Sequence, residues 1–193
     1  MLYSYRNIRW DLMLVSYMRL REVILILFMA ILSSSLVNAA ELIIPHTNFS
    51  LSVPDSFTEL SEADIESKWG AHNPNRPKWA VGNEYMGTTI SYSINPFNIS
   101  AEPLPEVLAV MQENMSRVVP GIKWVSYDVR NIGNKDWAYL EFTSFAIDQD
   151  IHNIMLIRPS GDVMVILNFN SVTRDFDSYE EEIRASIDSI KLQ

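Results

Sequence analysis

Apolar and polar residues alternate with a period of two in several stretches of the chain, which is typical of β-strands. Residues 49–54 alternate and end at a proline, which predicts a short edge or opening strand. Residues 79–95 contain apolar residues at alternate positions at 90, 92 and 94 and predict a second strand that ends before a proline. The inward-facing side chains of these two strands are predicted to be Phe49, Leu51, Val53, Ile90, Tyr92 and Ile94. Four further strands are predicted at residues 122–129, 137–147, 151–158 and 163–170.

A short helix is predicted between the first two strands. Ser61 and Asp64 have the spacing of a capping box, in which a hydroxyl and a carboxylate bond the free backbone N–H groups of a first turn. The helix is expected to run through about Trp69. Residues 70–78 contain a glycine and two prolines, which cannot continue it, so they are predicted to form a loop.

Two longer helices are predicted from apolar residues three and four positions apart. Residues 104–119 have this period and are followed by a proline and a glycine, which end a helix. Ser178 and Glu181 have the spacing of a second capping box. They are expected to open a last helix that runs to the C-terminus, with Tyr179, Ile183, Ile187 and Ile190 on its buried side.

The order of these elements is β, short α, β, long α, four β and long α, without the βαβ alternation that builds a parallel sheet. Residues 154–157 and 163–167 are apolar at every position, so both faces of that part of the sheet need cover. A hairpin at residues 159–162 is expected to join these two strands. We therefore predict an α+β fold in which helices flank a largely antiparallel β-sheet.

The first forty residues have the pattern of a secretory signal peptide. A basic stretch at 19–22 precedes an apolar run at 23–32, and small and polar residues follow. The apolar run is half of the roughly 20 residues that a membrane-spanning helix needs. We therefore predict cleavage after Ala39, with an uncut membrane anchor as the alternative. Residues 40–193 are then a single exported domain without stable membrane insertion.

The stretch before the apolar run is long for a signal peptide. Residues 1–17 include the charged residues Arg6, Arg9 and Asp11. Translation from Met18 is therefore an alternative to translation from Met1, and residues 1–17 carry no argument about the fold.

The chain contains 15 basic and 24 acidic residues, for a net charge of −9 at pH 7, and no cysteine. Binding of nucleic acid or of anionic lipid requires a basic surface, so neither partner is expected. Without cysteine there is no thiol nucleophile, disulfide or thiolate zinc site. An acidic, cysteine-free exported domain fits the bacterial periplasm, which is the predicted location.

Four short segments carry a resemblance to a known superfamily. They are residues 49–57, residues 118–121 at the end of the second helix, the hairpin at 159–162, and residues 187–192. Together with the element order they resemble the PsbP/Mog1/DcrB-like domains. The resemblance implies the α/β/α sandwich of that superfamily and a role in binding other proteins without catalysis. It assigns no site residue to this chain.

Asp148, Asp150 and His152 occupy alternate positions at the start of a predicted strand, so their side chains are expected to share one face. Two carboxylates and an imidazole at this spacing can bind a divalent cation. The alternative is a polar strand end that binds nothing, which an acidic chain produces by chance. Apart from such a cation, no cofactor is expected.

The loop at residues 70–78 is the predicted partner-binding surface. Trp69 and Trp79 flank this loop, and His72 and Arg76 lie within it. Tryptophan and arginine are enriched where proteins bind one another. The alternative is that both tryptophans are core residues at the ends of their elements.

The sequence contains no GxSxG, HExxH, P-loop or GxGxxG motif, so we do not expect an enzyme. We predict a non-catalytic periplasmic protein that binds a protein partner or assists its assembly and stability. One alternative is a periplasmic immunity protein that neutralises a secreted toxin, because an acidic surface complements a basic enzyme cleft. Another is an envelope domain that binds a cation or a small molecule.

Overall fold

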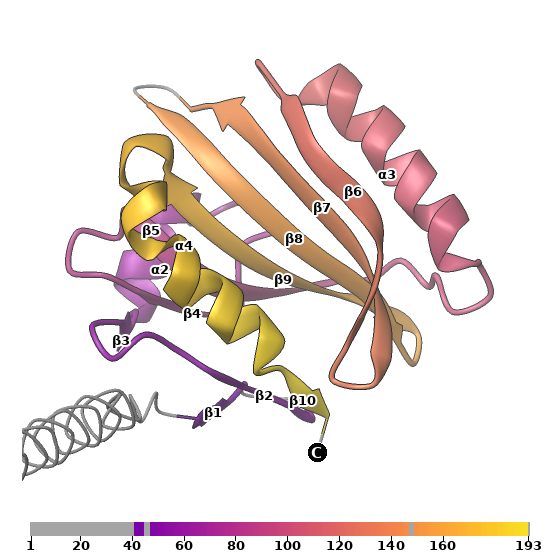
Figure 1. Cartoon of the computed structure of the whole chain (residues 1–193), viewed down its shortest axis with the longest axis horizontal. Coiled ribbons are helices and arrows are strands. Elements are labelled where there is room, and N and C mark those ends of the chain that lie inside the picture. The colour runs from indigo at the N-terminus through magenta and orange to yellow at the C-terminus, as the bar shows by residue number, and fades with distance from the viewer. Residues whose placement is uncertain (1–40, 45–46, 147–148, 193) are drawn as a thin grey trace, which may run out of the picture. The chain divides into compact units, whose positions relative to one another are not determined.

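A seven-stranded antiparallel sheet forms the centre of the structure, a computed structural model that describes residues 41–44, 47–146 and 149–192 (Figure 1). In order across the sheet, its strands are β3 (Thr58–Glu59), β4 (Trp79–Gly82), β5 (Thr88–Asn95), β9 (Val163–Val172), β8 (Asp150–Ser160), β7 (Lys135–Phe145) and β6 (Lys123–Ile132). Every neighbouring pair is antiparallel. The predicted α+β fold with a largely antiparallel sheet is confirmed.

A second sheet joins the two ends of the described chain. It consists of β1 (Glu41–Ile43), β2 (Phe49–Ser52) and β10 (Lys191–Leu192), with β2 in the middle. The prediction that residues 49–54 form an edge strand is therefore wrong, because β1 and β10 both pair with β2. The last described residues form a strand, and the predicted continuation of a helix to the C-terminus is wrong as well.

The first two helices of the described residues lie where the sequence predicts them. They are α2 (Glu62–Trp69) and α3 (Leu104–Val118). The predicted capping box is confirmed: the Asp64 N–H donates to Ser61 Oγ at 3.2 Å, and the Ser61 N–H donates to Asp64 Oδ2 at 3.1 Å. None of the helices in the described residues is long and apolar enough to cross a membrane.

The last helix, α4 (Thr173–Asp188), begins earlier than predicted. It follows β9 directly, and its N-cap residue, Val172, makes no side-chain capping bond. Ser178 lies inside the helix, where its backbone N–H already takes part in the helical ladder, so the predicted second capping box is wrong.

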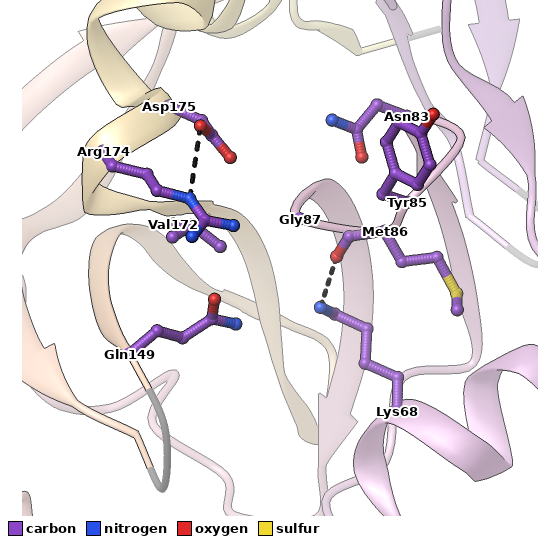
Figure 2. A pocket seen from close by; sticks show the side chains of 9 residues that line it. All are labelled: Lys68, Asn83, Tyr85, Met86, Gly87, Gln149, Val172, Arg174 and Asp175. Carbon is purple, nitrogen blue, oxygen red and sulfur yellow. Dashed lines mark hydrogen bonds and ion pairs between the residues drawn. The ribbon is translucent and has the colours of Figure 1, made fainter.

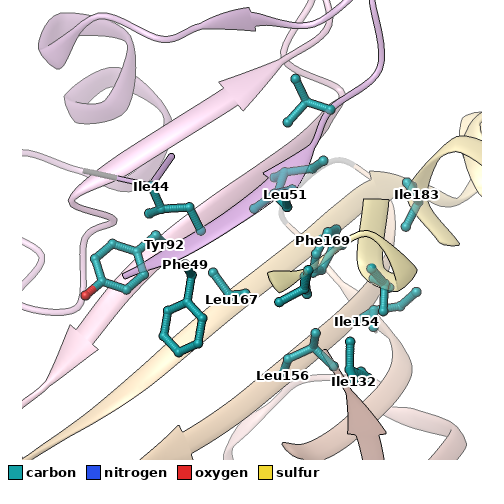
Figure 3. Packing of buried hydrophobic residues seen from close by; sticks show 14 of the residues in the cluster. Ile44, Phe49, Leu51, Tyr92, Ile132, Ile154, Leu156, Leu167, Phe169 and Ile183 are labelled. Carbon is teal, nitrogen blue, oxygen red and sulfur yellow. The ribbon is translucent and has the colours of Figure 1, made fainter. Parts of the chain in front are cut away.

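The helices cover the two faces of the large sheet, as the apolar runs in β8 and β9 require. On one face α3 packs on β6 and β7, with Leu108, Leu140 and Phe142 in a shared apolar cluster. On the other face α4 packs on β8, β9 and β2. Figure 3 shows this larger core, to which β2, β8, β9 and α4 all contribute side chains. Its labelled residues are Ile44, Phe49, Leu51, Tyr92, Ile132, Ile154, Leu156, Leu167, Phe169 and Ile183.

Residues 79–95, predicted as one strand, form a hairpin in which β4 pairs with β5. The turn between them is held by the Thr88 N–H, which donates to Asn83 Oδ1 at 3.2 Å. Met86 in this turn has a positive φ of 53°, a conformation that non-glycine residues seldom adopt. The alternation of residues 90–94 does not reveal this turn, whereas Gly82, Asn83 and Gly87 are residue types that favour one.

The turn between β6 and β7 packs closely against Ile190, which lies between α4 and β10. Gly133 and Asn134 both have positive φ, as in the two-residue turns that join twisted hairpins. A Cβ atom on Gly133 would clash with the carbonyl oxygen of Ile190, whereas a Cβ atom on Gly161 (φ +60°) would contact nothing within 4 Å. Gly161→Ala should therefore lower the free energy of unfolding by about 1–2 kcal/mol, the backbone cost alone. Gly133→Ala should lower it by more, and equal losses in urea titrations of the two variants would contradict this packing.

Candidate functional site

A cavity of about 350 Å³ opens where the β4–β5 turn meets the end of α2 and the start of α4 (Figure 2). Its lining residues are Lys68, Asn83, Tyr85, Met86, Gly87, Gln149, Val172, Arg174 and Asp175. Figure 2 shows Arg174, Asp175 and Gln149 on one side and Asn83, Tyr85 and Met86 on the other. The volume is in the range of small-molecule sites, but the walls are polar rather than apolar.

Charged groups of both signs line this cavity. Lys68 Nζ donates to the backbone oxygen of Met86 at 2.6 Å, and burial lowers the pKa of Lys68. Arg174 Nε lies 3.6 Å from Asp175 Oδ1. No serine, cysteine or histidine is among the lining residues, so the cavity lacks the usual nucleophiles and an imidazole base. Its charged and polar walls suit the binding of a small polar molecule.

The predicted partner-binding loop at residues 70–78 is tied to the helix before it. Arg76 donates to the carboxylates of Glu62 at 2.6 Å and Glu66 at 2.8 Å, so its guanidinium is already used within the chain. Trp79 is buried in the larger core and cannot contact a partner, so its prediction as a binding residue is wrong.

The remaining two residues predicted for this surface are accessible to different degrees. His72 is exposed, and Trp69 is half-buried with Lys68 Nζ 5.3 Å from its ring centroid. Contact of Trp69 and His72 with a partner stays a prediction.

The predicted metal ligands do not all share one environment. Asp148 lies outside the described residues, and Asp150 is exposed at the start of β8. His152 is buried under α4, with its ring stacked on Phe176 at a centroid distance of 3.5 Å. Its Nε2 lies 2.8 Å from Glu141 Oε1, so this nitrogen is already hydrogen-bonded within the chain. Within the described residues no three histidine or acidic side chains are grouped for a metal, and the site that includes Asp148 stays a prediction.

Glu141 is the centre of a buried polar network that sequence reasoning missed. Its side chain is 3% exposed, and it accepts hydrogen bonds from Tyr139 Oη at 2.6 Å and Arg184 Nη2 at 2.9 Å, besides its contact with His152. The indication of this network in the sequence was a single glutamate within the apolar part of a predicted strand, because a buried charge needs partners.

The pKa values in this network follow from burial and pairing. Burial alone would raise the pKa of Glu141, but hydrogen bonds from His152, Arg184 and Tyr139 outweigh it and lower the pKa to about 2. Burial and the nearby carboxylate raise the pKa of Tyr139 to about 12. Arg130 lies over the Tyr139 ring at 3.3 Å and closes the network on the side of β6. Because Arg184 lies on α4 and Glu141 on β7, the network joins α4 to the sheet.

An exposed apolar surface runs along β6. Within the large sheet β6 is an outermost strand, so one side of its backbone has no partner among the described strands. Val125, Tyr127 and Val129 of β6 are exposed, Tyr127 to 49%, and Tyr127 and Val129 share one face of the strand. We call these three side chains and the free backbone edge the β6 edge surface. Edge strands with exposed apolar side chains are places where other chains add on.

Comparison with protein families gives no match, and comparison with curated proteins gives none. Among solved structures, the chain is similar to the cyanobacterial PsbP protein CyanoP from Synechocystis sp. PCC 6803. The TM-score is 0.55 at 8% identity, over 79% of this chain and 91% of that one. A variant of Mog1 (TM-score 0.48, 10% identity, 79% and 94% covered) also matches. So does LpqN, described as involved in cell envelope biogenesis of Mycobacterium tuberculosis (TM-score 0.43, 13% identity, 74% and 82% covered).

The likeness to CyanoP, together with the antiparallel sheet and its covering helices, shows a PsbP-like fold, as the sequence resemblance implied. At this level of identity the likeness extends to the fold alone.

Proposed function

We propose that this protein is an exported, non-catalytic accessory protein that binds a protein partner through the β6 edge surface. The observation that carries the proposal is the exposure of Val125, Tyr127 and Val129 on a ten-residue strand whose outer edge pairs with no other described strand. A partner strand can extend the sheet there through backbone hydrogen bonds, while the three apolar side chains bury part of its surface.

The edge also has features that restrict which chains can add to it. A bulge between Trp124 and Ser126 interrupts the regular pairing, and Asp128 and Arg130 place charges on the opposite face of β6. Bulges and edge charges are devices that prevent indiscriminate strand addition. The β6 edge surface therefore suits a specific partner better than general aggregation.

Export and the absence of catalysis are supported by separate observations. The sequence pattern of residues 19–40 is that of a cleaved signal peptide, which supports a periplasmic location. The polar cavity beside the β4–β5 turn has no serine, cysteine or histidine among its lining residues, and CyanoP shares the fold of this chain. The net charge of −9 favours a partner with a basic surface.

Site-specific photocrosslinking in the native host tests the proposal. A benzophenone amino acid replaces Tyr127 in one version of the full chain and Tyr85, an exposed tyrosine on the β4–β5 turn, in the control. We expect position 127 to capture one abundant envelope protein that position 85 does not capture. Absence of a protein adduct at position 127, or equal capture of the same protein at both positions, would overturn the proposed surface. Capture of a secreted toxin would indicate that this protein acts as an immunity protein.

A further inference from the structure

A second apolar feature, separate from the β6 edge surface, lies along one side of α3. A groove of about 420 Å³ is formed by the loop between β5 and α3, one side of α3 and Met164 at the start of β9. We call it the α3 groove. Phe97 and Val110 on its walls are 69% and 57% exposed. Large apolar side chains are seldom this exposed next to an apolar groove unless the groove takes up a ligand or partner.

Phe97 is exposed but held in position. Its N–H donates to Asn95 Oδ1 at 3.1 Å, and the next residue, Asn98, accepts from the N–H of Ser100 at 2.9 Å. The Asn98 side chain also donates to Asp162 Oδ1 at 3.1 Å, which fastens the loop to the β8–β9 turn. A partner that packs on Phe97 therefore loses little entropy by ordering the loop, which is how preorganised aromatic residues come to dominate interfaces.

The floor of the groove is adaptable. Met111 and Met164 line it, and unbranched methionine side chains repack around apolar groups of different shape. The floor can therefore accept a large apolar side chain without fixing which one.

The polar rim of the groove is acidic. Glu102 and Glu106 line it, and Asp162 is bonded to the neighbouring Asn98. No lysine or arginine is among its lining residues, and the ion pairs of the described residues include neither glutamate. Carboxylates beside an apolar groove attract basic side chains and repel acidic ones.

We propose that the α3 groove binds a segment of a protein partner in which a large apolar side chain is flanked by lysine or arginine residues. The apolar side chain packs between Phe97 and Val110, and the basic side chains pair with Glu102 and Glu106. This inference deepens the proposed function and rests on it, because the segment belongs to the protein partner.

The same crosslinking approach, with a benzophenone amino acid in place of Phe97 in the full chain, tests the inference. We expect an adduct whose crosslinked partner peptide, sequenced by mass spectrometry, contains an apolar residue next to at least two basic residues. Glu102→Lys together with Glu106→Lys should reduce the adduct yield at least several-fold. Val118→Lys, which adds a positive charge at an exposed apolar position of α3 outside the groove, is the matched control and should leave the yield unchanged.

The outcomes separate the two proposals. An adduct at position 127 without one at position 97 would overturn the α3 groove as a docking site and leave the β6 edge surface intact. An adduct at position 97 with a lipid, or with an acidic peptide, would overturn the partner chemistry proposed here, and so would equal yields in the charge-reversal and control variants. Absence of adducts at both positions would overturn both proposals.

Discussion

Replacement of Trp137 by alanine is expected to lower the free energy of unfolding by about 3–5 kcal/mol. Trp137 is fully buried between the two sheets: its ring lies 5.3 Å from that of Phe49 on β2, and its Nε1–H donates to the backbone oxygen of Ile132 at 3.3 Å. The Arg158 guanidinium lies 5.3 Å from the same ring. The substitution removes the contact that holds β2 on the large sheet and leaves a cavity that rigid strands cannot close.

Urea titration followed by circular dichroism measures this loss. Tyr85→Ala is the matched control, because it truncates an aromatic side chain that is exposed in a turn and should cost about 0.5 kcal/mol or less. Similar losses in the two variants would show that the packing of Trp137 does not hold the sheets together.

The second large effect is expected at Glu141 and depends on pH. The pKa of this carboxyl is about 2 in the folded chain against a usual value of 4.5, so folding favours its ionised form. The carboxylate therefore contributes its full stabilisation above pH 4.5 and loses it as the pH falls towards 2. The difference corresponds to roughly 3 kcal/mol at neutral pH. Tyr139, His152 and Arg184 contact the carboxylate. Their hydrogen bonds are strongest while the carboxylate is ionised, and they are the source of this stabilisation.

Unfolding measured at pH 7, 5 and 3 tests this dependence. Glu141→Gln should destabilise the protein by roughly 3 kcal/mol at pH 7 and by less at pH 3, where the wild-type carboxyl is already protonated in the unfolded chain but not yet in the folded one. Glu113→Gln, which changes an exposed carboxylate paired with Arg117 on α3, should change little at any pH. A loss from Glu141→Gln that stays constant from pH 7 to pH 3 would contradict the lowered pKa.

The elements that depend on local chemistry were predictable from the sequence. Ser61 and Asp64 meet within one turn of α2, so their spacing alone defines the helix start. Ser178 has the same spacing to Glu181, yet α4 begins at Thr173, because the chain turns into the helix directly from β9. A capping box indicates that a helix can start at a residue, and a preceding strand can impose an earlier start.

Pairings between distant residues could not be predicted. The contact between His152 and Glu141 follows from the register of β7 and β8, in which His152 lies opposite Thr143, and no spacing along one strand reveals it. The same holds for Trp79, whose burial depends on the packing of the core around β4. His152 and Trp79 were candidates for metal and partner binding because of their residue types. In the folded chain His152 contacts Glu141, and Trp79 packs in the core.

The small sheet has a consequence for when the chain can reach its folded form during synthesis. β2 pairs with β10, so Phe49 lies opposite Leu192, and the Ser52 N–H donates to Ser189 Oγ at 2.7 Å. A chain that is synthesised from its N-terminus delivers β2 early and β10 last. The central strand of the small sheet therefore cannot pair on both sides until almost all of the described residues have been made. Until then β2 lacks one of its two partner strands, so the small sheet is completed late in folding.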